Sequence, residues 1–135
     1  MVLKLEEERK DTHFKLYLPD VGMLSSAFCG ITTEETRKAL LENYVMQTLT
    51  AGENCSLCFW ESEAQAKVDF IIRKSEEETP VELRISSKSK GKSVLSYLKR
   101  NNNPGGKYYQ FGFENFFSTS VVAHIPYYAI FCLRV

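Results

Sequence analysis

The sequence has no excess of either charge. Lys and Arg total 17, and Asp and Glu also total 17, so the net charge at pH 7 is zero. A balanced chain has no overall electrostatic attraction toward nucleic acid or toward a membrane surface. Any affinity for a phosphate backbone must therefore come from a local cluster of basic residues.

Long apolar runs are also missing. No window approaches the roughly 18 to 20 apolar residues that a membrane span needs, and Met1 to Lys10 is too charged for a signal peptide. We therefore expect a cytoplasmic protein without a membrane partner. Residues 1–13 are expected to be a charged stub or linker. With 135 residues, of which 44% are hydrophobic, the chain predicts a single domain over residues 14–135.

Cysteines are few, and they follow no dense disulfide pattern. Cys55 and Cys58 form a C-x-x-C pair, which is found in zinc sites and in redox sites. Zinc needs two further ligands, and neither His13 nor His124 lies at a recognisable spacing. A redox pair normally opens a helix, whereas residues 55–60 have the composition of a strand. We interpret both thiols as buried structural cysteines.

A complete nucleotide-binding loop is absent. The segment from Ser86 to Ser93 ends in Gly-Lys-Ser but falls one residue short of G-x-x-x-x-G-K-[ST]. It lacks the first glycine, whose backbone turn a serine adopts poorly, and no later apolar strand ends in an aspartate that would hold magnesium. We expect no ATP site in this chain.

Hydrophobic periodicity predicts a mixed α/β (α+β) domain. A helix is expected after Asp20, and a longer helix is expected to follow a capping box of Thr32 with Glu35 and to end before Gly52. Residues 14–18 alternate as a short extended segment. Further strands are predicted at 56–60, 67–73, 81–86, 107–117 and 121–125, a helix at 93–100, and a helix or strand over 127–135.

Two of the predicted strands carry a carboxylate at their centre, Asp69 in one and Glu82 in the other. Strand interiors disfavour acidic residues, and a buried charge without a partner is costly. If the two strands form a hairpin centred between Glu76 and Glu77, Asp69 faces Arg84. A shift of one residue puts Asp69 opposite Glu82, and in either register alternation places all three side chains on one face.

Two chemical interpretations of this face stay open. Carboxylates so close repel each other unless a cation lies between them, and Mg²⁺ prefers hard oxygen ligands and keeps waters that a phosphodiester can displace. Alternatively Asp69 and Arg84 form a cross-strand ion pair while Glu82 points to solvent. Surface ion pairs are common, so geometry alone favours this second interpretation.

A basic stretch follows the second of these strands. Lys88, Lys90 and Lys92 lie within it, with few acids among them. Next to a metal site such a stretch would contact a phosphate backbone, so these lysines are candidate nucleic-acid contacts. The alternative is a solvated loop and helix face whose charge is balanced by acids elsewhere.

Segments spread over nearly the whole chain resemble a known family. They are Phe14 to Leu24, Leu41 to Val45, Phe59 with Trp60, Val68 to Ile72, Pro80 to Arg84, and Ile125 to Ile130. In this order they resemble an uncharacterised C-terminal domain of bacterial and archaeal AAA-family ATPases. That family in turn resembles the PD-(D/E)XK restriction-endonuclease fold, which implies a central mixed sheet flanked by helices.

The resemblance implies a nuclease core in which Glu42, Asp69 and Glu82 hold Mg²⁺, with Arg84 in place of the expected lysine. Glu42 would otherwise be an ordinary helix residue that reaches solvent. Arginine stays charged and cannot act as a base, although it can stabilise charge on a phosphate. The resemblance therefore implies a non-catalytic or weakly active nuclease-like module that contacts DNA and works with an AAA-type ATPase in cis or in trans. The alternatives are a Mg²⁺-dependent DNA endonuclease and a structural assembly domain.

Overall fold

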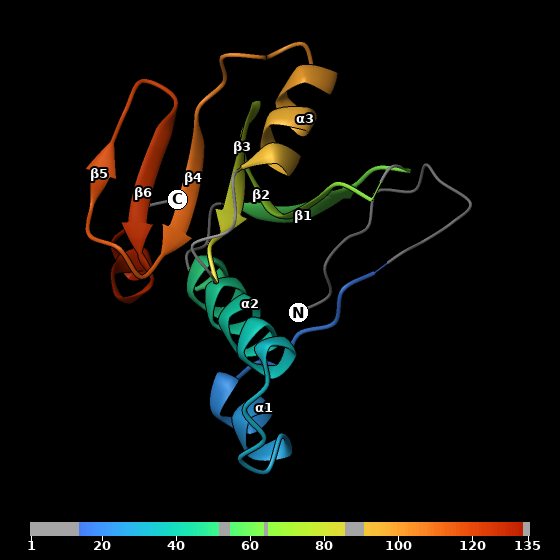
Figure 1. Cartoon of the computed structure of the whole chain (residues 1–135), viewed down its shortest axis with the longest axis vertical. Coiled ribbons are helices and arrows are strands. Elements are labelled where there is room, and N and C mark those ends of the chain that lie inside the picture. The colour runs from blue at the N-terminus through green and yellow to red at the C-terminus, as the bar shows by residue number, and fades with distance from the viewer. Residues whose placement is uncertain (1–13, 52–54, 64, 86–90, 134–135) are drawn as a thin grey trace.

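The computed structural model describes residues 14–51, 55–63, 65–85 and 91–133. Its centre is a six-stranded mixed sheet in the order β1-β2-β3-β4-β6-β5, with helices on both of its faces (Figure 1). The predicted mixed α+β class is confirmed. No helix within the described ranges has the length and apolar character of a membrane span.

Two helices precede three strands, and a third helix precedes three further strands and a 3-10 helix. In chain order they are α1 (Val21–Ala27), α2 (Glu34–Thr50), β1 (Ser56–Glu61), β2 (Lys67–Lys74), β3 (Glu77–Leu83), α3 (Lys92–Arg100), β4 (Tyr108–Gly112), β5 (Phe117–Ser118), β6 (Val122–Pro126) and the 3-10 helix η1 (Tyr127–Cys132). The first three strands pair antiparallel, whereas β4 is parallel to both β3 and β6.

The hairpin between β2 and β3 is tighter than predicted. Lys74 pairs with Glu77, so that only Ser75 and Glu76 connect the two strands, and Ser75 adopts a positive φ of 55°. The register places Phe70 opposite Val81. Of the two registers predicted from the sequence, this is the second, in which the pairing is shifted by one residue.

Two apolar clusters cover the two faces of the sheet. On one face α2 packs Val45, Met46 and Leu49 onto residues of β2, β3, β4 and β6. On the other face α3 packs Val94, Tyr97 and Leu98 onto residues of β2 and β4. The clusters are separate because successive residues of a strand point to opposite faces.

Strand β2 breaks this alternation at a β-bulge. Against β1, Cys58 pairs with Ile71 and Trp60 with Val68, so β2 uses one more residue than β1 over this stretch. Val68 and Ile71 both belong to the α3-side cluster, which strict alternation forbids, and Phe70 belongs to the α2-side cluster. The extra residue turns Asp69 over to the same face as Phe70.

Three local predictions need correction. The capping box of α2 consists of Thr33 and Thr36, whose hydroxyls bond each other's backbone N–H at 3.2 and 2.9 Å, instead of Thr32 with Glu35. The single strand predicted over residues 107–117 is interrupted between β4 and β5. Cys55 and Cys58 are free thiols, but they are half-buried instead of buried as predicted, and burial raises the pKa of Cys55.

Candidate functional site

The extended segment before α1 is fixed to α2 by one buried amide. Asn43 is 1% exposed, its Oδ1 accepts the backbone N–H of Leu18 at 2.8 Å, and its Nδ2 donates to the Leu18 carbonyl at 3.1 Å. The side chain thereby pairs with both polar groups of one residue, as a neighbouring strand would. This anchor holds residues 14–18 between α2 and the sheet.

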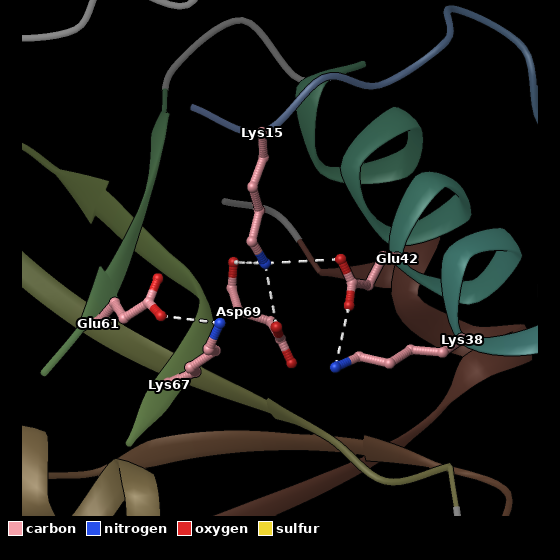
Figure 2. Close-up of polar contacts among 6 residues, drawn as sticks. All are labelled: Lys15, Lys38, Glu42, Glu61, Lys67 and Asp69. Atoms are coloured by element: carbon pink, nitrogen blue, oxygen red, sulfur yellow. Dashed lines mark hydrogen bonds and ion pairs between the residues drawn. The ribbon is translucent and has the colours of Figure 1, made fainter. Parts of the chain in front are cut away.

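Lys15 of this segment lies between the two carboxylates that come from the sheet and the helix (Figure 2). Its Nζ is 3.0 Å from Asp69 Oδ1 and 3.5 Å from Glu42 Oε2. It also donates to the Asp69 carbonyl at 3.5 Å, and Lys38 approaches the other oxygen of Glu42 at 3.5 Å. Two ammonium groups therefore balance two carboxylates.

The three central side chains are largely shielded from water. Lys15, Glu42 and Asp69 are 27%, 15% and 17% exposed, so salt screens their attraction less than it screens a surface pair. The Lys15 ammonium also lies 5.7 Å from the ring centroids of both Phe59 and Phe70. These rings add cation–π attraction to the ion pairs.

Two tyrosines border this cluster. Burial raises the pKa of Tyr17, and the carboxylates of Glu42 and Asp69 raise it further. Burial likewise raises the pKa of Tyr127, with Asp69 and Glu42 adding to the effect. The buried Tyr17 hydroxyl lies near Glu42 but makes no hydrogen bond of good geometry with the described residues. Both phenols stay neutral near pH 7, so neither provides a base.

Glu82 lies on the opposite face of the sheet. Its Oε1 accepts the backbone N–H of Gly91 at 2.8 Å, and its Oε2 accepts from Gln110 Nε2 at 2.7 Å. Gly91 is the N-cap of α3, so the carboxylate lies where the positive end of the helix dipole favours it. The prediction that Asp69 and Glu82 share a face is wrong, because the β2 bulge separates them.

Arg84 pairs with neither Asp69 nor Glu82, the two carboxylates predicted to share its face of the sheet. Its Nη1 pairs with Glu114 Oε2 at 3.1 Å, while its backbone N–H donates to the Phe111 carbonyl at 2.7 Å. The alternative prediction, an ion pair between Asp69 and Arg84, is therefore wrong as well. Asp69 pairs with Lys15 instead.

A buried polar pair extends from Glu82 along β4 and β6. His124 is 1% exposed, its Nδ1 lies 3.3 Å from Gln110 Oε1, and its Nε2 lies 3.2 Å from the Glu114 carbonyl. Phe117 stacks on the imidazole at 4.9 Å. Sequence reasoning missed this pair, although polar residues at the centre of two apolar strands were a usable signal.

Gly91 allows a test of the left-handed backbone conformation at the start of α3. It has φ +65°, and a Cβ there would lie 2.9 Å from the Tyr108 hydroxyl oxygen. We expect Gly91→Ala to lower the free energy of unfolding by about 2 kcal/mol, because a non-glycine residue is strained in this conformation. Gly105→Ala, where a Cβ would meet nothing within 4 Å, is the matched control. Equal urea midpoints for the two variants would contradict this role of Gly91.

The arrangement does not fit the magnesium site implied by the resemblance. The Lys15 ammonium lies between Asp69 and Glu42, and Glu82 points away on the other face. Within the described ranges, no group of three or more His, Cys, Asp or Glu side chains is placed to hold a metal ion. The structure thus brings together two of the three predicted carboxylates.

The candidate nucleic-acid contacts are only partly described. Lys88 and Lys90 lie outside the described residues, and Lys92 is exposed in the first turn of α3. Lys99 and Arg100 are exposed in its last turn. The helix therefore presents basic side chains to solvent at both of its ends.

Comparison with protein families adds one finding. The profile of a family described as a domain of unknown function, DUF4143, matches residues 37–128. This chain belongs to the DUF4143 family. Neither the curated proteins nor the solved structures gave a match.

The matched range separates the two halves of the charged cluster. Glu42 and Asp69 lie within the DUF4143 match, whereas Lys15 and its anchored segment precede it. The carboxylates thus come from the matched part of the domain, and the central ammonium comes from the segment that precedes it.

Proposed function

We propose that this DUF4143 chain is a non-catalytic, nuclease-like module that works with an AAA-type ATPase and contacts DNA. The observation that carries the non-catalytic part is the position of the Lys15 ammonium, 3.0 Å from Asp69 and 3.5 Å from Glu42. It supplies the counter-charge that a metal-dependent nuclease takes from Mg²⁺. The ATPase association and the nuclease-like fold rest on the sequence resemblance.

The other residues of the implied core have structural tasks. Glu82 binds the first turn of α3 and Gln110, which leaves its carboxylate oxygens engaged. Arg84 pairs with Glu114 and, as a guanidinium, cannot deprotonate an attacking water. In this proposal, the residues that the resemblance implies for phosphodiester hydrolysis stabilise the fold through these contacts instead.

Contact with DNA would involve α3. Lys92, Lys99 and Arg100 are exposed on this helix, and Lys88 and Lys90 precede it in the sequence. Basic side chains of this kind contact phosphates without reading the bases, so the affinity should fall steeply with salt.

The deciding experiment is incubation of supercoiled and branched DNA with Mg²⁺ or Mn²⁺. We expect no nicking above the buffer background by the native chain, by Asp69→Asn or by Arg84→Lys, because Lys15 blocks metal binding between the carboxylates. The same gels are expected to show DNA retarded at low salt. Metal-dependent nicking that disappears in Asp69→Asn would refute the proposal and establish an endonuclease.

Nicking seen only with Arg84→Lys would also refute the proposal that Lys15 blocks metal binding between Asp69 and Glu42. It would mean that a single substitution silences an otherwise competent site, with Lys15 displaced by the metal. Absence of both nicking and retardation would remove DNA from the proposal and leave a structural assembly domain.

A further inference from the structure

An apolar groove of about 620 Å³ lies between α1, α2 and the loop after β4. Its walls include Val21 of α1, Leu40, Leu41 and Tyr44 of α2, and Phe113 of the loop. Its lining residues include none of the charged cluster of Lys15, Lys38, Glu42 and Asp69.

The groove exists because α2 is longer than its contact with the sheet. All the buried residues of this helix fall from Asn43 onward, whereas its N-terminal half extends past the strands toward α1 (Figure 1). Helix α1 packs on α2 and has no buried residue of its own. Two helices thus face solvent with apolar side chains that the sheet does not cover.

Phe113 closes one side of this groove while remaining 67% exposed. Its ring packs against Tyr127 with centroids 5.0 Å apart, and Tyr44 donates a hydrogen bond to the Tyr127 carbonyl at 3.2 Å. The wall is therefore held in place by the core beneath it. Apolar side chains of a partner that pack against this wall would leave water together with it, which favours association.

Arg37 is the one charged residue among those that line the groove. Within the described residues it makes no ion pair, although α2 carries Glu34 and Glu35 in its first turn. An unpaired guanidinium beside an apolar floor complements a carboxylate that is flanked by apolar side chains.

We infer that this groove binds a segment of another protein that presents bulky apolar side chains beside a carboxylate. The groove is wide open to solvent, so a small molecule would stay largely hydrated there, whereas a helix laid against it buries one face. This inference rests on the proposed function only in treating the chain as a non-catalytic module that binds a partner protein.

The test uses two synthetic amphipathic helical peptides as probes. Both carry leucines at helical spacing, and they differ at one neighbouring position, which is Glu in one and Lys in the other. By fluorescence anisotropy we expect the full chain to bind the Glu peptide more tightly. Phe113→Ser should weaken this binding about tenfold, because it removes one apolar wall. Phe116→Ser is the matched control, since Phe116 is similarly exposed but does not line the groove.

Charge complementarity is tested by reversing Arg37. Arg37→Glu should invert the preference so that the Lys peptide binds better, whereas Lys74→Glu, at an exposed position outside the groove, should leave it unchanged. Equal binding of both peptides by the native chain, or insensitivity to Phe113→Ser, would overturn the inference. A dimer in sedimentation that Phe113→Ser dissociates would also overturn it, because the occupant would then be a second copy. None of these outcomes depends on the nicking assay, so either proposal can fail alone.

Discussion

Replacing Lys15 with methionine is expected to lower the free energy of unfolding by about 2 kcal/mol. Methionine keeps an unbranched apolar side chain against Phe59 and Phe70 but removes the charge that lies between Glu42 and Asp69. Removing one partner of a fully buried pair costs about 3 to 5 kcal/mol, and the partial exposure of this site reduces that figure. Urea unfolding followed by the fluorescence of Trp60 gives the measurement.

The same variant should acquire a response to magnesium. With the ammonium gone, two carboxylates face a space that a hard cation can enter, so millimolar Mg²⁺ should restore part of the lost stability. The native chain should show no such response. Lys67→Met is the matched control, because Lys67 pairs with Glu61 at the surface and should cost less than about 1 kcal/mol. If both variants lose the same stability and neither responds to Mg²⁺, Lys15 has no special role.

Much of the fold could be predicted because its signals are local. The helical period of α2, the short amphipathic α3 and the apolar runs of β2 and β3 are each readable within a single segment. The register of the hairpin was harder, since it depends on a two-residue turn in which Ser75 takes a positive φ. Serine rarely adopts that conformation, so the sequence favours a longer connection.

The candidate site was only half predictable for a different reason. Glu42 and Asp69 both contact Lys15, but the face of Glu82 depends on one extra residue in β2, and no residue type marks a bulge of this kind. The contact of Lys15 with Asp69 joins residues 54 positions apart. Periodicity within one segment carries no information about such a contact, which depends on where the segment docks.

Asn43 decides that docking, and its replacement by leucine should cost more than the loss of Lys15. The two hydrogen bonds to Leu18 would disappear, and the backbone groups released would have to be hydrated or remain unpaired. We expect a loss of about 3 kcal/mol, with faster hydrogen exchange of the Leu18 amide. Gln47→Leu removes the single bond to the Val21 N–H and should cost about 1 kcal/mol.

Combining Asn43→Leu with Lys15→Met separates anchoring from charge. If Asn43 acts by holding the segment that carries Lys15, the first substitution already withdraws the ammonium from Asp69, and the second has little left to remove. The double variant should then lose clearly less stability than the sum of the single losses, as coupled residues do. Additive losses would instead show that Lys15 keeps its contacts without the anchor. In that case the attraction of the two carboxylates, rather than the amide of Asn43, positions the lysine.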